Sequence, residues 1–129
     1  MTQARGSLPQ IQSAIDLGTN TILMVTGYLD GDSVHILDDA HEIARLGKGV
    51  DATRQILPET IDRVCGLLAD YRRRAKGLGA TRIRAFGTSA LRDAANKEAF
   101  IAAAGQVGVR LVELSGDQEA RYTFAGAAF

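Results

Sequence analysis

Apolar residues along the chain follow two different periods, which predict short strands and longer helices. Five segments rich in apolar and β-branched residues are typical of β-strands, because such side chains pack well on a pleated surface. They are residues 11–16, 21–29, 33–37, 81–86 and 110–114. Asp30-Gly31 separates the second segment from the third and predicts a tight hairpin. Residues 1–10 show no period, and we expect them to form a flexible tail.

Apolar side chains spaced by three and four residues predict an amphipathic helix from residue 58 to about residue 76. Pro58 suits the first position of this helix, where a backbone N–H is not needed. Gly77 and Gly79 are expected to end it, since glycine readily adopts the left-handed conformation after a helix. The other predicted helical segments are a short turn capped by Thr88 or Ser89, a helix over residues 97–106 capped by Asn96, and a last helix that begins near Gly116.

The resulting order of elements, β-β-β-α-β-α-β-α, predicts an α/β fold. Strands joined through a helix are usually parallel neighbours with a right-handed crossover. A three-strand meander followed by two such units gives a mixed five-stranded sheet flanked by helices. This is the ribonuclease H-like arrangement, which resembles the half-domain of the actin, Hsp70 and sugar-kinase superfamily.

The composition fits one ordinary globular domain, with 129 residues of which 46% are apolar and 23% charged. Fifteen basic and fifteen acidic residues balance, so nothing in the overall charge points to nucleic acid or to a membrane surface. Twelve of the basic residues are arginine, whose planar guanidinium suits phosphate oxygens in local sites. No apolar run reaches the ~18 residues that a membrane span requires. No leader pattern opens the chain, so we expect a cytoplasmic protein.

Cysteine and histidine offer little chemistry. The single Cys65 excludes an internal disulfide and a cysteine zinc site, and its place on the apolar helix face predicts a buried structural thiol. His35 and His41 have no second ligand at metal spacing, so we expect solvent-facing positions on or near a strand. Residues 46–53 contain two glycines but lack the spacing of a Walker phosphate loop.

The strongest candidate for chemistry is the turn from Asp16 to Thr21, between the first two predicted strands. It combines a carboxylate, a glycine and small hydroxyl or amide side chains. Phosphate needs close backbone approach and N–H or O–H donors, and a nearby acid can hold a metal ion or its water. Turns rich in Gly, Asn and Thr also join hairpins without binding anything. From these residues alone both interpretations stay open.

Four segments in this order resemble the Ppx/GppA family of exopolyphosphatases and guanosine pentaphosphate phosphatases. They are residues 14–21, 45–50, 87–96 and 114–121. The resemblance covers residues 11–129 nearly end to end, and it disfavours a sugar or acetate kinase. It implies hydrolysis of the terminal phosphoanhydride bond of inorganic polyphosphate, or of the 5′-γ phosphate of guanosine pentaphosphate.

The resemblance also implies roles for the matching residues. Asp16 would help to hold Mg²⁺ or its water, and Arg92 would clamp a phosphoryl oxygen. Glu119 would be the general base that activates the attacking water, although without the resemblance it would be an ordinary acid in the first turns of a helix. The implied phosphate-binding residues are Gly18, Thr19, Asn20, Thr21, Thr88 and Ser89.

Some family features are missing. Gln118 stands where the family often has the first Glu of a Glu-Glu pair, and the family's second phosphate loop does not occur before Phe129. We therefore expect residues 11–129 to be an N-terminal subdomain that carries half of a cleft, with a homodimer in the full-length protein. The alternative is a non-catalytic half-domain that binds phosphate or a nucleotide, or that dimerises.

Overall fold

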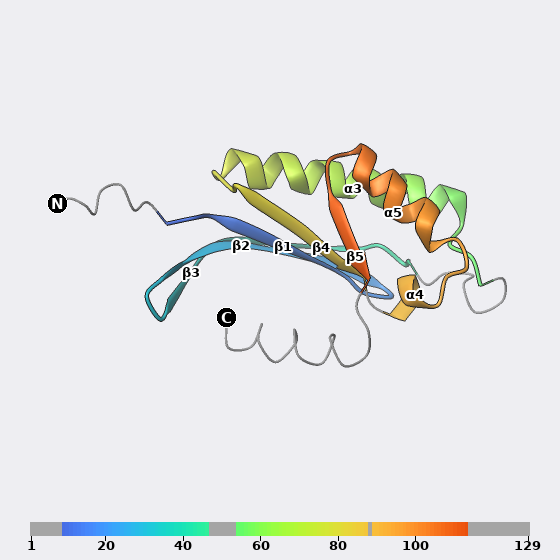
Figure 1. Cartoon of the computed structure of the whole chain (residues 1–129), viewed down its shortest axis with the longest axis horizontal. Helices are drawn as coiled ribbons and strands as arrows, with labels where there is room; N and C mark the ends of the chain where they lie inside the picture. Colours follow the sequence, from blue (N-terminus) through green and yellow to red (C-terminus); the bar gives the residue numbers. More distant parts are fainter. Residues whose placement is uncertain (1–8, 47–53, 88, 114–129) are drawn as a thin grey trace.

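The computed structural model of the chain describes residues 9–46, 54–87 and 89–113, arranged as one sheet with helices against it (Figure 1). The predicted last helix, starting near Gly116, lies outside the described residues. The elements are β1 (Gln12–Leu17), β2 (Thr21–Asp30), β3 (Ser33–Ile43), α3 (Pro58–Gly77), β4 (Arg82–Gly87), α4 (Ser89–Arg92), α5 (Lys97–Gln106) and β5 (Arg110–Glu113).

The sheet has five strands in the order β3-β2-β1-β4-β5. The first three strands pair antiparallel as a meander, whereas β4 pairs parallel with β1 and β5 pairs parallel with β4. In Figure 1, α3 and α5 lie together on one side of this sheet. The mixed five-stranded sheet flanked by helices confirms the predicted fold class.

The core forms between the helices and one face of the sheet. In β1 the side chains of Ile15 and Leu17 are buried, while those of Ala14 and Asp16 point to the other face and are exposed. Phe100 of α5 is fully buried in the same core. The face of the sheet turned away from α3 and α5 is called the opposite face below.

Buried polar groups in this core are few and mostly satisfied. The hydroxyls of Ser13 and Thr26 hydrogen-bond to each other across β1 and β2, at 2.6 Å. The Cys65 thiol is buried as predicted, and desolvation raises its pKa.

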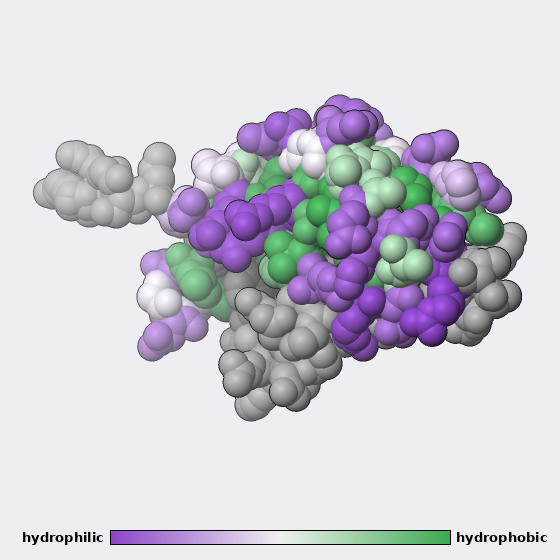
Figure 2. All heavy atoms as spheres, turned by 45° about the vertical axis from the view of Figure 1, so that its right-hand side comes forward, coloured by the Kyte–Doolittle hydropathy of each residue, from purple (hydrophilic) through white to green (hydrophobic). Residues whose placement is uncertain are grey.

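Within the described residues, no helix is both long and apolar enough to cross a membrane. Figure 2 shows hydrophilic side chains over much of the visible face, with hydrophobic ones between them.

The third strand is longer than the sequence predicts. It continues past residue 37 to Ile43, so the predicted end was wrong. Most of the extra residues are polar, and one of them, Asp38, binds Arg74 of α3 with two hydrogen bonds. The Nε and Nη2 atoms of Arg74 donate to Oδ2 and Oδ1 of Asp38, at 2.5 and 2.7 Å. In the sequence, a charged strand residue that pairs with a helix cannot be distinguished from a loop residue, which is why the strand end was predicted too early.

The Asp38–Arg74 pair makes the stability of the fold depend on pH. The hydrogen bond from Arg74 holds the pKa of the Asp38 carboxyl below its ordinary value. A lowered folded-state pKa stabilises the protein above the unfolded pKa of about 3.9 and ceases to do so as the pH falls through the folded value. Asp38→Asn should therefore lower the urea midpoint at pH 7, and the difference from the wild type should shrink well below pH 4. Asp32→Asn, in the exposed β2–β3 turn, is the control and should change little at either pH. An Asp38→Asn deficit that stays constant down to low pH would contradict this account.

Candidate functional site

The turn between β1 and β2 is closed by its own backbone. Leu17 and Ile22 are the last partners of the two strands, which leaves residues 18–21 at the end of the hairpin. The N–H of Gly18 donates to the carbonyl of Thr21 at 2.9 Å. A Cβ on Gly18 would lie 3.2 Å from that same carbonyl, so a larger residue would crowd the turn. The amide of Gly18 is thus already engaged within the turn, and the next three residues, Thr19, Asn20 and Thr21, are exposed.

The residues that follow β3 support this turn through hydrogen bonds. The carbonyl of Asn20 accepts hydrogen bonds from the N–H groups of Ala44 and Arg45, at 2.8 and 3.0 Å. The carbonyl of Ala44 accepts one from Nη2 of Arg63 in α3, at 2.5 Å. Arg45 has a φ of 51°, which is uncommon for a residue with a side chain. Ala44 and Arg45 therefore support the turn, and no pattern in the sequence indicated the contribution of Arg63.

Parallel pairing brings the other predicted phosphate-binding segment to the same edge of the sheet. Leu17 of β1 is the partner of Gly87 of β4, and Gly87 is the partner of Glu113 of β5. The carboxyl ends of all three strands therefore lie at one level. The β1–β2 turn and α4 both start from this edge (Figure 1). The backbone thus brings together Asp16, the turn up to Thr21, and α4 with Ser89 and Arg92, whereas Thr88 and Glu119 lie outside the described residues.

Close packing sets α4 against the end of β4. Leu91 is fully buried, and a Cβ on Gly87 would lie 2.9 Å from the Cβ of Leu91. Such a distance is shorter than van der Waals contact, so only glycine allows α4 to turn this tightly over the strand. The position of Arg92, one residue further on, depends on that turn.

Asn96 has a role that differs from the predicted one. It stands at the start of α5, but its side chain makes no capping hydrogen bond. Instead its Oδ1 accepts from the N–H of Ile56 at 2.8 Å, and its Nδ2 donates to the carbonyl of Ile56 at 3.0 Å. The N–H of Ala95 also donates to the carbonyl of Arg54 at 2.6 Å. The predicted cap was wrong because the amide instead joins the end of α4 to the segment that precedes α3.

An ion pair links the start of α5 to the end of β5. Nζ of Lys97, the first residue of α5, lies 2.9 Å from Oε2 of Glu113, the last residue of β5. Both side chains are about two-thirds buried, with exposed fractions of 28% and 31%. Sequence reasoning assigned no interaction to either residue, because nothing local links them.

The donors available for a metal ion are hard oxygens. No group of three His, Cys, Asp or Glu side chains suited to a metal ion occurs among the residues that the structure describes. His35 and His41 are exposed as predicted, and His35 stacks on Tyr28 with ring centroids 4.8 Å apart. Mg²⁺ is commonly bound through one or two carboxylates together with substrate phosphates. Asp16, followed by threonine hydroxyls, is a donor set that fits this pattern.

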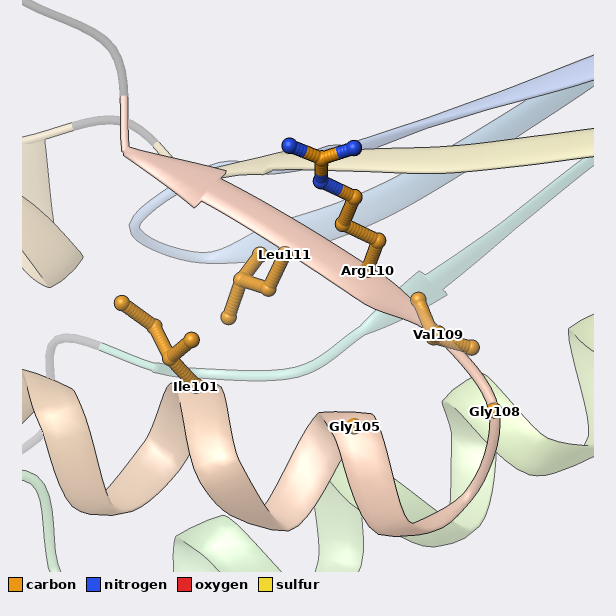
Figure 3. Close-up of a pocket in the computed structure, with 6 residues that line it drawn as sticks. All are labelled: Ile101, Gly105, Gly108, Val109, Arg110 and Leu111. Atoms are coloured by element: carbon orange, nitrogen blue, oxygen red, sulfur yellow. The ribbon is translucent and has the colours of Figure 1, made fainter.

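A hollow between α5 and β5 is a poor match for a phosphate. It measures about 450 Å³, lies between α5 and β5 (Figure 3), and is lined mainly by Ile101, Val109 and Leu111 with Gly105 and Gly108. Its one charged lining residue, Arg110, extends from the side of β5 away from α5. The hollow therefore lacks converging donors, and the candidate site is the strand edge described above.

The fold is that of an α/β protein with a mixed five-stranded sheet flanked by helices, and the β1–β2 turn lies at the carboxyl edge of its parallel strands. The solved structure of the Aquifex aeolicus member of the Ppx/GppA family superimposes with a TM-score of 0.86, at 22% identity, over 93% of this chain and 40% of that one. This likeness concerns the fold. Residues 25–129 match the model of the Ppx/GppA phosphatase family. The chain therefore belongs to the Ppx/GppA phosphatase family.

Curated relatives carry two different activity names. Exopolyphosphatase 2 of Mycobacterium tuberculosis is 38% identical over 125 residues, covering 89% of this chain and 39% of that protein. A guanosine-5′-triphosphate,3′-diphosphate pyrophosphatase of Photobacterium profundum is 30% identical over 125 residues, covering 96% of this chain and 25% of that protein. The chain spans 25% to 39% of the length of these two relatives.

Adding one methyl group at Gly87 should disturb the packing of α4. Gly87→Ala would force Leu91 or the α4 backbone to move, which typically costs about 1–3 kcal/mol of unfolding free energy. Urea denaturation measures this. Gly66→Ala is the control, because Gly66 is exposed within α3 and a Cβ there meets nothing within 4 Å. The control should gain about 0.5–1 kcal/mol. Equal effects of the two variants would show that the close approach at Gly87 is not a constraint.

Removing the Asn96 amide should loosen the connection to Ile56. Asn96→Ala leaves the backbone N–H and carbonyl of Ile56 without these partners, and an unmet buried donor or acceptor costs about 1–3 kcal/mol. Faster hydrogen exchange at the Ile56 amide should accompany the loss of stability. Asn96→Asp keeps the acceptor for that N–H and should protect the Ile56 amide better than Asn96→Ala. Gln106→Ala, an exposed amide at the end of α5, is the control. Unchanged exchange at Ile56 in Asn96→Ala would count against this role.

Proposed function

We propose that this chain supplies one half of the active site of a phosphoanhydride hydrolase. The reaction is release of orthophosphate from the end of inorganic polyphosphate, or removal of the 5′-γ phosphate of guanosine pentaphosphate. One observation carries the proposal: Leu17 and Gly87 are partners in parallel strands, so the β1–β2 turn and α4 meet at one edge. Family membership and the names of the relatives support the class of reaction.

The proposed roles follow the chemistry of phosphoryl transfer, in which positioning and charge neutralisation supply most of the rate. Thr19, Asn20 and Thr21 from the turn, with Gly18 allowing close approach, would hold the terminal phosphate together with Thr88 and Ser89. The guanidinium of Arg92 would pair with its oxygens through charge-assisted hydrogen bonds. Asp16 would hold Mg²⁺, which neutralises phosphate charge when bound.

Glu119 completes the proposal as the general base. Its carboxylate would take a proton from the water that attacks the terminal phosphorus. A positioned base usually contributes about 10²–10⁴-fold to the rate. Glu119 follows β5, whose end at Glu113 lies at the level of Leu17 and Gly87.

The proposed arrangement of the protein is two-lobed. Residues 11–129 form one lobe, preceded by a tail over residues 1–10, and the second lobe carries the other phosphate loop. We further propose a cytoplasmic enzyme that is a homodimer at full length. Exposed apolar side chains on β2 and β3 favour the second candidate function, a half-domain that binds phosphate or dimerises without turnover. They are Leu23, Leu29, Ile36, Leu37 and Ile43.

Replacing the proposed base separates the two functions. In the full-length protein, Glu119→Gln should lower the rate of phosphate release from polyphosphate by about 10²–10⁴-fold. Substrate binding should persist, because the change removes a proton acceptor and leaves the phosphate contacts intact. Glu98→Gln is the matched control, since Glu98 is an exposed acid in the first turn of α5. It should retain activity within twofold.

Two outcomes of this experiment contradict the proposal. Unchanged turnover in Glu119→Gln would remove Glu119 from the role of base. Binding of polyphosphate with no turnover in the parent protein would favour the non-catalytic half-domain. The 129-residue chain alone is expected to show no appreciable turnover, because in this proposal it supplies only one of the two phosphate loops.

A further inference from the structure

One arginine of α3, Arg63, is linked to the β1–β2 turn through two peptide units, although the proposed function gives it no role. Its Nη2 donates to the carbonyl of Ala44 at 2.5 Å. That carbonyl belongs to the same peptide unit as the N–H of Arg45, which donates to the carbonyl of Asn20 at 3.0 Å. The carbonyl of Asn20 in turn shares its peptide unit with the N–H of Thr21. These groups are called the Arg63 relay.

The dipoles of the Arg63 relay are aligned. In a trans peptide unit the N–H and the C=O point in opposite directions. A donor bound to the carbonyl of such a unit makes its N–H a stronger donor, and hydrogen bonds in a chain strengthen each other by about 10–30% per bond. The N–H of Thr21 stands at the end of the relay and points away from Arg45. The positive charge of Arg63 therefore acts on a donor of the β1–β2 turn.

The charge of Arg63 is not neutralised by a carboxylate within the described part of the chain. Arg63 forms no ion pair there, whereas Arg73 of the same helix pairs with Asp70. The carbonyl that Arg63 binds belongs to Ala44, a fully buried residue, so water screens this contact less than it screens one at the surface. The relay therefore directs positive potential toward the turn and not into an internal ion pair.

The backbone at Arg45 adds a second observation. Its φ of 51° is sparsely populated by residues with a side chain, and such conformations persist where the surrounding structure holds them. This angle sets the direction of the peptide unit between Ala44 and Arg45, which is the unit that Arg63 binds. Arg63 therefore stabilises a backbone unit that orients the carbonyl of Asn20.

We propose that Arg63 is a positioning residue for phosphate binding, which orients and polarises the β1–β2 turn through the relay. The inference rests on the proposed function for the identity of the bound group, the terminal phosphate of the substrate. Backbone N–H groups bind phosphate well when they are fixed in direction and lie in a positive potential, as at helix N-termini and in anion-binding turns. Arg63 supplies both conditions to the N–H of Thr21.

Steady-state kinetics of the full-length protein test this role. The turn would contact the same phosphate in the ground state and in the transition state, so weakening it should affect KM more than kcat. Arg63→Met should raise KM for polyphosphate and the inhibition constant of orthophosphate about tenfold, because a hydrogen bond to a charged group is worth about one decade or more in affinity. Arg63→Lys keeps a charged donor and should restore both constants to within about threefold of the wild type.

Arg73→Met is the matched control. It makes the same change in the same helix, at an exposed arginine whose partner is Asp70. Its KM should stay within about twofold of the wild type, as expected for an exposed ion pair. Hydrogen exchange at the amides of residues 44 and 45 should be faster in Arg63→Met and unchanged in Arg73→Met. If Arg63→Met does not fold, Arg63→Gln replaces it with the same expected results.

The possible failures are distinguishable. Faster exchange at residues 44 and 45 with unchanged KM and inhibition constant would show a structural role alone, which overturns the positioning role and leaves the proposed function standing. Unchanged exchange would overturn the relay. If the wild type releases no phosphate, the proposed function fails, and orthophosphate binding, followed by NMR at the amides of residues 18–21, tests the relay. Weaker binding in Arg63→Met than in Arg73→Met would then support it, whereas equal binding or no binding would overturn it.

Discussion

Parallel pairing of β1 with β4 is the constraint on which the candidate site depends. These strands are far apart in the sequence, and the 20-residue helix α3 lies on the connection that returns the chain to the sheet. Because Leu17 is level with Gly87, two turns that are separated by some 70 residues open at the same edge. The core also fixes the direction of Asp16: burial of Ile15 and Leu17 leaves Asp16 on the opposite face, and a slip of one residue would reverse both.

The turns at this edge are held by groups that have no proposed contact with a ligand. The carbonyl of Asn20 is held by two N–H groups that follow β3, and Arg63 of α3 holds the residue that provides one of them. The Asn96 amide does the same for the segment around α4 through Ile56. Functional groups keep their geometry only when such supporting hydrogen bonds restrain them. Binding a small, highly charged phosphate group in a fixed orientation would require restraint of this kind.

Local pattern was sufficient to predict the fold but not the contacts around the site. The spacing of apolar residues located the strands and helices, because that spacing reflects burial of one face. Turn residues marked where these elements end. The end of β3 was mispredicted because its continuation contains the charged residue Asp38. The partner of Asp38 is Arg74, which lies 36 residues away in the sequence. Asn96 has the chemistry of a cap, and only the tertiary structure shows that Ile56 uses its amide instead. The roles of Asp16, Arg92 and Glu119 remain predictions, since they concern a ligand.

The two faces of the sheet are chemically unequal. One face is buried under α3 and α5, and most of its residues are apolar. The opposite face carries Asp16 at the end of β1, because burial of Ile15 and Leu17 turns the residue between them away from the core. A carboxylate repels a phosphate unless a cation lies between them, so the proposed binding of a phosphate at the β1–β2 turn also requires the proposed Mg²⁺ at Asp16. The proposed reaction therefore depends on the face that Asp16 occupies, and the packing of β1 against the core decides that face.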